Sequence, residues 1–512
     1  MTVSRMLVQL KNNFNAVRHL MSKILYSFPC ILAAFVLILQ FFTISNGQDI
    51  NATIRITVDK RVTAEIIGTF SPTLLRKNPR NFSILNDFAG STDLAGRFSN
   101  LKLSERSGDL LPHKAFSLSE LVTERDIGKF SYTVDLTPLP RPSAAAHNSW
   151  ANEEAGVLML DDLLPQQSGS TALIKFQMPE GWSFSSSERR TGSQEFDVAN
   201  IEKAVFYVGT GRREKFLAVG RSQIKLSISG EWFFSDEDAA QMVSSIFAEY
   251  SKIFGNSPTS DVNIAILKFP VTVNTGNWEA DTRGRSVTIV SSDTPFKSQS
   301  KQRLHEQLRH EIFHLWMPNG VNLSGNFDWF YEGFALYQSL RTGVATNAIG
   351  FDNLLDTLSR AHAIDAGQAK RLSLIDASKN RFSGANTQVY ARGMLVAFLC
   401  DLALLQNSKG KRSVENVLRE IYQKHHNKEL RVDGNEAVLA VFAQYPELRP
   451  ITERYITGSE KIGWTEYLQM VGLETGAKNS ASRLSVMKKL TSRQKDLLDK
   501  LGYNMWRKLS KD

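Results

Sequence analysis

The stretch RLHEQLRHEIFHLWMPNG, Arg303 to Gly320, holds two histidines four positions apart. In a helix, positions i and i+4 lie on one face, so the imidazoles of His310 and His314 would be one turn apart. A single metal ion bridges that separation. Glu311 follows His310 directly, where its carboxylate reaches a water on such a metal without being a ligand. The alternative is an ordinary solvated turn of a helix, and the rest of the chain decides between the two.

A catalytic metal needs a third protein ligand beside an open position. A Pro-Asn-Gly sequence at 318–320 ends the first helix, and the segment FDWFYEGFALYQSL begins a second one, with Glu332 near its start. An antiparallel second helix brings Glu332 against the two histidines. Asp328 is the only other carboxylate in this interval, and it fits better as the N-cap of the second helix. We therefore predict that His310, His314 and Glu332 bind one zinc ion.

The overall composition is that of a globular protein with an uneven charge distribution. The 512 residues are 42% hydrophobic and 22% charged, which suffices for two or three domains with cores of their own. The net charge is +9, but the excess lies at the ends, since residues 1–47 contribute +4 and residues 478–512 contribute +7. The chain between them is close to neutral, so we expect no nucleic-acid partner.

The N-terminal segment indicates export. Lys23 precedes the apolar run ILYSFPCILAAFVLILQFFTI, and small residues follow it in SNGQD. A basic start, an apolar centre and small residues predict a signal peptide over residues 1–47, and hence a periplasmic or extracellular protein. The run is also long enough for an uncleaved N-terminal membrane anchor, and this alternative stays open. Removal of the segment would leave Cys400 as the only cysteine, which excludes an intramolecular disulfide.

The periodicity of the chain changes near residue 235. Before this point, alternating or β-branched runs predict strands at 52–59, 130–136, 172–178, 204–210 and 222–230. After it, a helix over 236–255 and a strand over 262–270 precede helices at 301–316, 329–343, 352–363, 389–406, 413–425 and 435–443. We expect a multidomain α+β protein with a β-rich domain over 48–235, a mainly helical domain over 236–475 and a basic helical tail over 476–512.

Several dispersed motifs resemble one peptidase clan. HEIFHLW followed by WFYEGFALY is similar to the gluzincin metallopeptidases, the thermolysin-like enzymes that bind zinc with two histidines and a glutamate. The chain looks most like the glycyl aminopeptidase family, and more distantly like the aminopeptidase N family. Further matches are GNWEA, WTEYLQMVGLE and the long segment from Val389 to Tyr422. The resemblance covers about 235–475 and implies a thermolysin-like, mainly helical zinc peptidase domain behind the β-rich one.

The resemblance also implies roles for individual residues. His310, His314 and Glu332 would hold the zinc. Glu311 would be the general base that activates water and later the acid that protonates the leaving amine. Tyr390, in VYARG, would donate a hydrogen bond to the oxyanion.

The implied substrate loop is Gly-x-x-Glu, Gly276 to Glu279. Glu279 would bind the free amino group of a peptide, and the strand over 285–292 would offer an edge for an extended peptide. Two departures from the relatives are visible. Seventeen residues separate His314 from Glu332, where aminopeptidase N relatives have eighteen, and Trp278 is bulkier than the family residue at its position.

These points predict zinc-dependent hydrolysis of peptide bonds in a peptide or protein substrate, of the aminopeptidase type. Two alternatives stay open, a zinc endopeptidase and a peptide-binding protein that keeps the zinc scaffold without turnover. The complete set of His310, Glu311, His314, Glu332 and Tyr390 speaks against the second alternative, because a decayed site would have lost a member.

Overall fold

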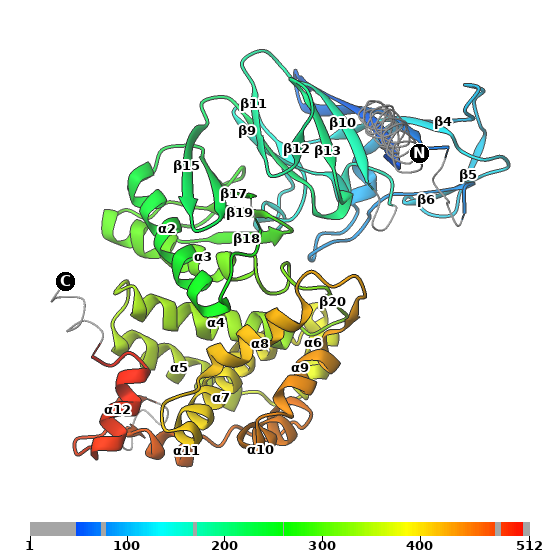
Figure 1. Cartoon of the computed structure of the whole chain (residues 1–512). Helices are drawn as coiled ribbons and strands as arrows, with labels where there is room; N and C mark the ends of the chain where they lie inside the picture. The colour runs from blue at the N-terminus through cyan, green and yellow to red at the C-terminus, as the bar shows by residue number, and fades with distance from the viewer. Residues whose placement is uncertain (1–47, 73–77, 167–170, 260, 477–482, 505–512) are drawn as a thin grey trace, which may run out of the picture. The chain divides into compact units, whose positions relative to one another are not determined.

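The computed structural model describes residues 48–72, 78–166, 171–259, 261–476 and 483–504 (Figure 1). The signal peptide or anchor predicted at 1–47 lies outside these residues. In the remainder, the predicted strands and helices are present with ends shifted by a few residues.

The β-rich part holds three sheets. The largest has seven strands, in the order β12 (Arg189–Arg190), β13 (Glu195–Val198), β10 (Ala172–Gln177), β1 (Ile50–Val58), β2 (Val62–Phe70), β7 (Lys129–Asp135) and β4 (Phe98–Ser104). A second has the order β11 (Ser183–Ser186), β14 (Val205–Gly209), β9 (Ala155–Met159) and β8 (Trp150–Ala151). The smallest consists of β3 (Asn81–Ser83), β6 (Glu120–Thr123) and β5 (His113–Ala115).

The core of this part lies between the two larger sheets. Alternate residues of β1, from Ile50 to Ile56, are buried, as a strand with one covered face requires. Across the gap, the rings of Phe176 on β10 and Phe206 on β14 are 4.8 Å apart. The alternating pattern in the sequence thus reflects a sandwich of sheets with an aromatic centre.

A mixed five-stranded sheet connects this part to the helices. Its order is β15 (Arg213–Val219), β16 (Ser222–Ile228), β17 (Asp261–Lys268), β19 (Ser286–Ser291) and β18 (Trp278–Arg283). Strands β16, β17 and β19 are parallel, while β15 and β18 run antiparallel at the two edges. The first two strands precede residue 235, so this sheet begins before the boundary expected from the sequence.

The edge strand differs from the predicted one. β19, within the range 285–292, is hydrogen-bonded to β17 on one side and β18 on the other, so its prediction as a free edge is wrong. The hairpin turn at Gly284 folds β18 outward and makes it the edge. β18 carries Glu279, so the predicted substrate loop and the sheet edge belong to one strand.

Helix α2 (Asp236–Phe254) illustrates how local signals set the helix ends. Ser235 accepts a hydrogen bond from the amide of Asp238, whose carboxylate accepts one from the amide of Ser235, a complete capping box. Gly255 ends the helix with φ 78°, a conformation that glycine adopts without strain. The buried face of α2 packs against β15 and α3, in agreement with the apolar periodicity.

The helical part, α2 and the five-stranded sheet share the largest core cluster of the described residues, and the helical part follows that sheet. Its α-helices are α3 (Lys297–Phe313), α4 (Asp328–Ala345), α5 (Phe351–Ala366), α6 (Leu374–Lys379), α7 (Gly393–Ser408), α8 (Val414–His425), α9 (Gly434–Phe442), α10 (Arg449–Ile451), α11 (Thr465–Met470) and α12 (Ser492–Lys500). Two π-helical turns, η6 (Gln388–Arg392) and η8 (Thr452–Ile456), and a short parallel pair, β20 (Leu323–Ser324) and β21 (Val432–Asp433), accompany them.

The centre of this part is the apolar helix that begins in η6. Within the described ranges, Gln388–Ser408 is the one helical stretch long and apolar enough to cross a membrane, and 94% of its apolar window is buried inside the protein. It is therefore a core helix. α4 passes it closely, since a Cβ on Gly333 would lie 2.5 Å from the backbone of Gly393. Two glycines thus allow the contact that places Glu332 and Tyr390 side by side.

The expected tail, 476–512, is only partly helical in its described portion. β23 (Leu484–Val486) pairs with β22 (Leu473–Thr475), and α12 follows. Leu484, Leu497 and Leu498 are buried, so this segment belongs to the core of the helical part.

Candidate metal centre

Three potential ligand atoms converge where α3 ends and α4 begins. His310 lies in the last turn of α3, His314 caps that helix, and Glu332 faces them from α4. The Nε2 atoms of the two histidines are 3.2 Å apart, and Oε2 of Glu332 lies 3.2 Å from that of His310 and 3.5 Å from that of His314. All three residues are buried. The predicted trio is therefore brought together.

These spacings fit zinc. Two ligand atoms at about 2.1 Å from a tetrahedral Zn²⁺ are about 3.4 Å from each other, close to all three distances above. The Oε2 atom of Glu332 is buried and accepts no hydrogen bond from the described residues. Burying several lone pairs away from water and without hydrogen-bond donors costs free energy, unless a cation binds among them. The donor set of two imidazoles and one carboxylate is that of a catalytic zinc site.

The proton on His314 is placed by its backbone neighbour. Nδ1 of His314 lies 2.8 Å from the carbonyl oxygen of Met317. Since a carbonyl only accepts, Nδ1 carries a proton, and in the neutral imidazole Nε2 then has a lone pair for a metal. Charge also favours the site, because the pKa of Glu332 lies well below its ordinary value. Burial alone would raise that pKa, but His314, His310 and Arg381 more than offset it.

The carboxylate of Glu311 is buried and is held by a hydrogen bond from the edge strand of the sheet. It is 4% exposed, and its Oε2 accepts a hydrogen bond of 2.7 Å from the hydroxyl of Thr282 on β18. This contact fixes the direction of the carboxylate and connects the edge strand to α3, the helix with the two candidate histidine ligands. Nothing in the sequence pattern singled out Thr282.

Tyr390 comes to the same centre from η6. Its ring lies 6.5 Å from that of His310, centroid to centroid, although 80 residues separate them in the chain. Burial first, and then the charge of Glu332, raises the pKa of Tyr390 well above its usual value. The phenol is therefore protonated at neutral pH and can act as a hydrogen-bond donor.

Arg381 joins these residues, and sequence reasoning missed it. Its Nη2 lies 2.6 Å from the phenol oxygen of Tyr390 and 3.0 Å from Oε1 of Glu332. Its Nη1 lies 2.7 Å from Oδ1 of Asp328. Asp328 is the first residue of α4 and Phe327 is its N-cap, so the prediction of Asp328 as the N-cap is wrong. An arginine in a loop nine residues before a tyrosine carries no periodic signal that would reveal this network.

The predicted substrate loop lies at the start of β18. Gly276 has φ +86°, which explains a glycine at that turn. Glu279 is more than half buried, and burial raises its pKa, while His147 acts in the opposite direction. Two residues on, Asp281 is already paired with Arg283 at 2.6 Å and lies 3.6 Å from His147. Of the two carboxylates on this strand, Glu279 therefore has less positive charge close to it than Asp281.

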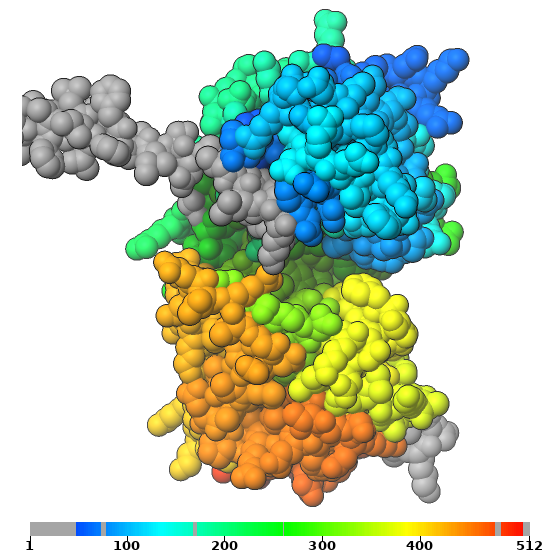
Figure 2. Space-filling model, turned by 90° about the vertical axis from the view of Figure 1, so that its right-hand side faces the viewer, coloured from blue at the N-terminus to red at the C-terminus, as the bar shows by residue number. Residues whose placement is uncertain are grey.

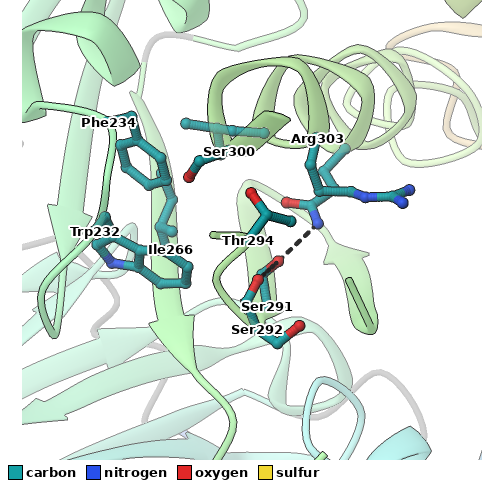
Figure 3. Close-up of a pocket in the computed structure, with 10 residues that line it drawn as sticks. Trp232, Phe234, Ile266, Ser291, Ser292, Thr294, Ser300 and Arg303 are labelled. Atoms are coloured by element: carbon teal, nitrogen blue, oxygen red, sulfur yellow. Dashed lines mark hydrogen bonds between the residues drawn. The ribbon is translucent and has the colours of Figure 1, made fainter. Parts of the chain in front are cut away.

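A small cavity lies behind this loop (Figure 3). Trp232 and Phe234 form one wall of the cavity, and residues of β19 and α3 form the other. Ser292, which also lines the cavity, donates a hydrogen bond to the carbonyl of Asn277 in the loop. Its volume of about 10 Å³ holds a single water. It is too small for a side chain of a substrate. A larger recess is visible in Figure 2, where the surface is hollowed between the blue and cyan strands and the yellow and orange helices.

Comparison with known proteins places the fold. No family model matches the chain, and no curated protein matches it in sequence. Among solved structures, an aminopeptidase N family protein from Idiomarina loihiensis is similar with a TM-score of 0.70 at 17% identity, covering 83% of this chain and 78% of its own. An M1 zinc metallopeptidase from Deinococcus radiodurans gives 0.51 at 15% identity, covering 81% and 93%.

A variant of the Deinococcus enzyme, bound to a Tyr-Ser-Ala substrate, gives a TM-score of 0.53 at 13% identity, covering 82% of this chain and 95% of that one. The chain thus has the fold of M1 zinc metallopeptidases. The expected architecture, a β-rich N-terminal part followed by a mainly helical peptidase-like part, is confirmed.

Proposed function

We propose that the protein is a zinc-dependent peptidase of the aminopeptidase type. The observation that carries this proposal is the convergence of His310, His314 and Glu332 beside a buried carboxylate, Glu311, and a protonated phenol, Tyr390. A merely structural zinc site would need four protein ligands and neither of the last two groups. The M1 fold of the chain agrees with this chemistry.

Each residue has a separate task in hydrolysis. A Zn²⁺ held by the two histidines and Glu332 would acidify a water and polarise the carbonyl of the scissile bond. Glu311, aligned by Thr282, takes the proton of the attacking water and passes it to the departing amine. Tyr390 donates a hydrogen bond to the carbonyl oxygen as negative charge develops on it.

The edge strand provides the surface for the substrate. Among the described residues β18 pairs with a strand on one side only, so its other side can pair with an extended peptide, except at the carbonyl of Thr282, which accepts a hydrogen bond from Asn319. Thr282 of this strand touches Glu311, so a peptide added along β18 passes the catalytic carboxylate. We propose that Glu279, three residues earlier on β18, binds the amino terminus of that peptide. Its carboxylate is half-buried, which strengthens its attraction to an ammonium group.

We further propose that the protein acts outside the cytoplasm, on the strength of the apolar segment within residues 1–47. Sequencing the N terminus of the protein from its native membrane or soluble fraction distinguishes a cleaved signal peptide from a retained anchor.

Three measurements on the purified protein test the activity. The protein should contain about one zinc per chain, and Glu311→Gln should keep the metal and lose hydrolysis. Digestion of a peptide library, with products identified by mass, should release N-terminal residues from free peptides and spare N-acetylated ones. Internal cleavage of both would favour the endopeptidase. Zinc binding with no cleavage would favour the peptide-binding protein and refute the proposal.

A further inference from the structure

Arg381 is placed to act on the catalytic tyrosine. It sits in the loop between α6 and η6, with its side chain 15% exposed, and its guanidinium meets three groups of the metal centre. Nη1 donates a hydrogen bond to Asp328 and Nη2 donates one to Tyr390, and Nη2 also forms an ion pair with Glu332. The guanidinium also lies 5.2 Å from the centroid of the Tyr390 ring.

The direction of the bond to Tyr390 follows from the chemistry of arginine. A guanidinium only donates, so the phenol oxygen must be the acceptor of the 2.6 Å contact. The O–H proton of Tyr390 therefore points elsewhere. Without substrate the carboxylate of Glu332 lies near the phenol, because the same Nη2 atom of Arg381 contacts both groups. Arg381 competes for that carboxylate by binding its Oε1, which leaves the phenol proton able to turn to an arriving carbonyl oxygen.

The positive charge of Arg381 also favours hydrogen-bond donation by the phenol of Tyr390. A hydrogen bond accepted from a cation polarises the phenol and makes its own O–H a stronger donor, most of all in a buried site. Asp328 anchors the guanidinium through Nη1, so its fork is fixed before substrate arrives. A lysine could supply the charge but not a planar fork that donates from two nitrogens, to Asp328 and Tyr390, at once.

We propose that Arg381 is a positioning residue for hydrolysis. It fixes the ring of Tyr390 and directs the phenol proton to the substrate carbonyl oxygen, where charge develops. This inference rests on the proposed peptidase function. Its effect should appear in the chemical step and not in the binding of substrate or metal.

A double-mutant cycle tests the coupling. Tyr390→Phe should lower kcat about 100-fold, as expected for the loss of one oxyanion donor. Arg381→Lys should lower kcat about 10-fold or more and change KM less than about twofold. In the Tyr390→Phe background, Arg381→Lys should have no further effect beyond about twofold, because its target is gone. Losses that multiply, or an unchanged kcat in Arg381→Lys, would overturn the proposal.

Two binding measurements exclude a role confined to the metal. Chelator competition should give the same zinc affinity for Arg381→Lys and wild type within about threefold, and a clear loss there refutes the proposal. Affinity for a phosphinic peptide, which mimics the tetrahedral oxyanion, should fall with kcat, whereas affinity for the product amino acid should not change. Equal losses for both ligands would show general damage to the site and would also refute it.

Arg412→Lys is the matched control. Arg412 pairs with Glu447 at 2.9 Å and lies over the ring of Tyr445, so it copies the chemistry of Arg381 away from the metal. Its activity should equal that of wild type. If neither wild type nor this control cleaves any peptide, the proposed function fails, which is distinct from a failure of the cycle. Should Arg381→Lys not fold, Asp328→Asn replaces it, and its loss of kcat must likewise vanish in Tyr390→Phe.

Discussion

Replacing Thr282 with valine isolates one hydrogen bond of the proposed catalytic centre. Valine has nearly the shape of threonine, so Thr282→Val removes the hydroxyl that donates to Oε2 of Glu311 at 2.7 Å and leaves the packing in place. Glu311 is 4% exposed, so water does not readily replace the lost donor. A hydrogen bond to a charged group contributes about 1.5–3 kcal/mol. If the bond aligns the carboxylate for proton transfer, kcat should fall about 10- to 100-fold, at about 1.4 kcal/mol for each factor of ten.

The assay is release of the N-terminal residue from a free peptide, with zinc content measured on the same samples. Thr282→Ser keeps the hydroxyl and should stay within about threefold of wild type, whereas Thr282→Val should keep its zinc and lose turnover. A Thr282→Val protein with wild-type kcat would refute the reasoning, as would a serine variant that is equally impaired.

Further predictions concern the helix crossing, the metal, the substrate loop and pH. Gly333→Ala places a Cβ 2.5 Å from the backbone of Gly393 and should lower stability by about 1–3 kcal/mol, seen as a lower urea midpoint. Zinc at about 1,000 times its Kd should stabilise the fold by about 4 kcal/mol, so chelation should lower Tm, but not in His314→Ala. Glu279→Gln should reduce the preference for free over N-acetylated peptides about tenfold or more, a loss that mass analysis of paired substrates measures directly. Burial raises the pKa of Asp161 to about 6, so the folded protein binds this proton more tightly than the unfolded chain, and stability falls as pH rises from about 4 through 6. Asp161→Asn should therefore stabilise by about 3 kcal/mol at pH 7.5 and about 1 kcal/mol at pH 4.5, and an equal gain at both values would contradict this cause.

The parts that sequence reasoning predicted share a local cause. His310 and His314 meet because four positions make one helical turn, and the strand β1 was visible because alternate residues are apolar. Glu332 could be proposed because only a short loop separates its helix from α3, so an antiparallel contact was the simple outcome. Tyr390 was identified by resemblance, since a lone tyrosine on an apolar helix has no distinguishing pattern.

Two features were decided only by the tertiary structure. The edge of the sheet is β18 and not β19, because strand order depends on how the hairpin at Gly284 folds back, which the alternation within each strand does not encode. Thr282 and Arg381 were invisible for a related reason, since each reaches its partner from a different element.

Periodicity along the chain thus determined the strands of the β-rich part, the helices and the two-histidine face of α3, because these depend on neighbours within a turn or a strand. The catalytic surroundings depend on three-dimensional packing. The glycine contact of α4 with α7 brings Tyr390 beside Glu332, and the loop before η6 brings Arg381 to both. The candidate zinc ligands could therefore be predicted from the sequence, while the groups that contact the proposed base and the proposed oxyanion donor appeared only when distant segments came into contact.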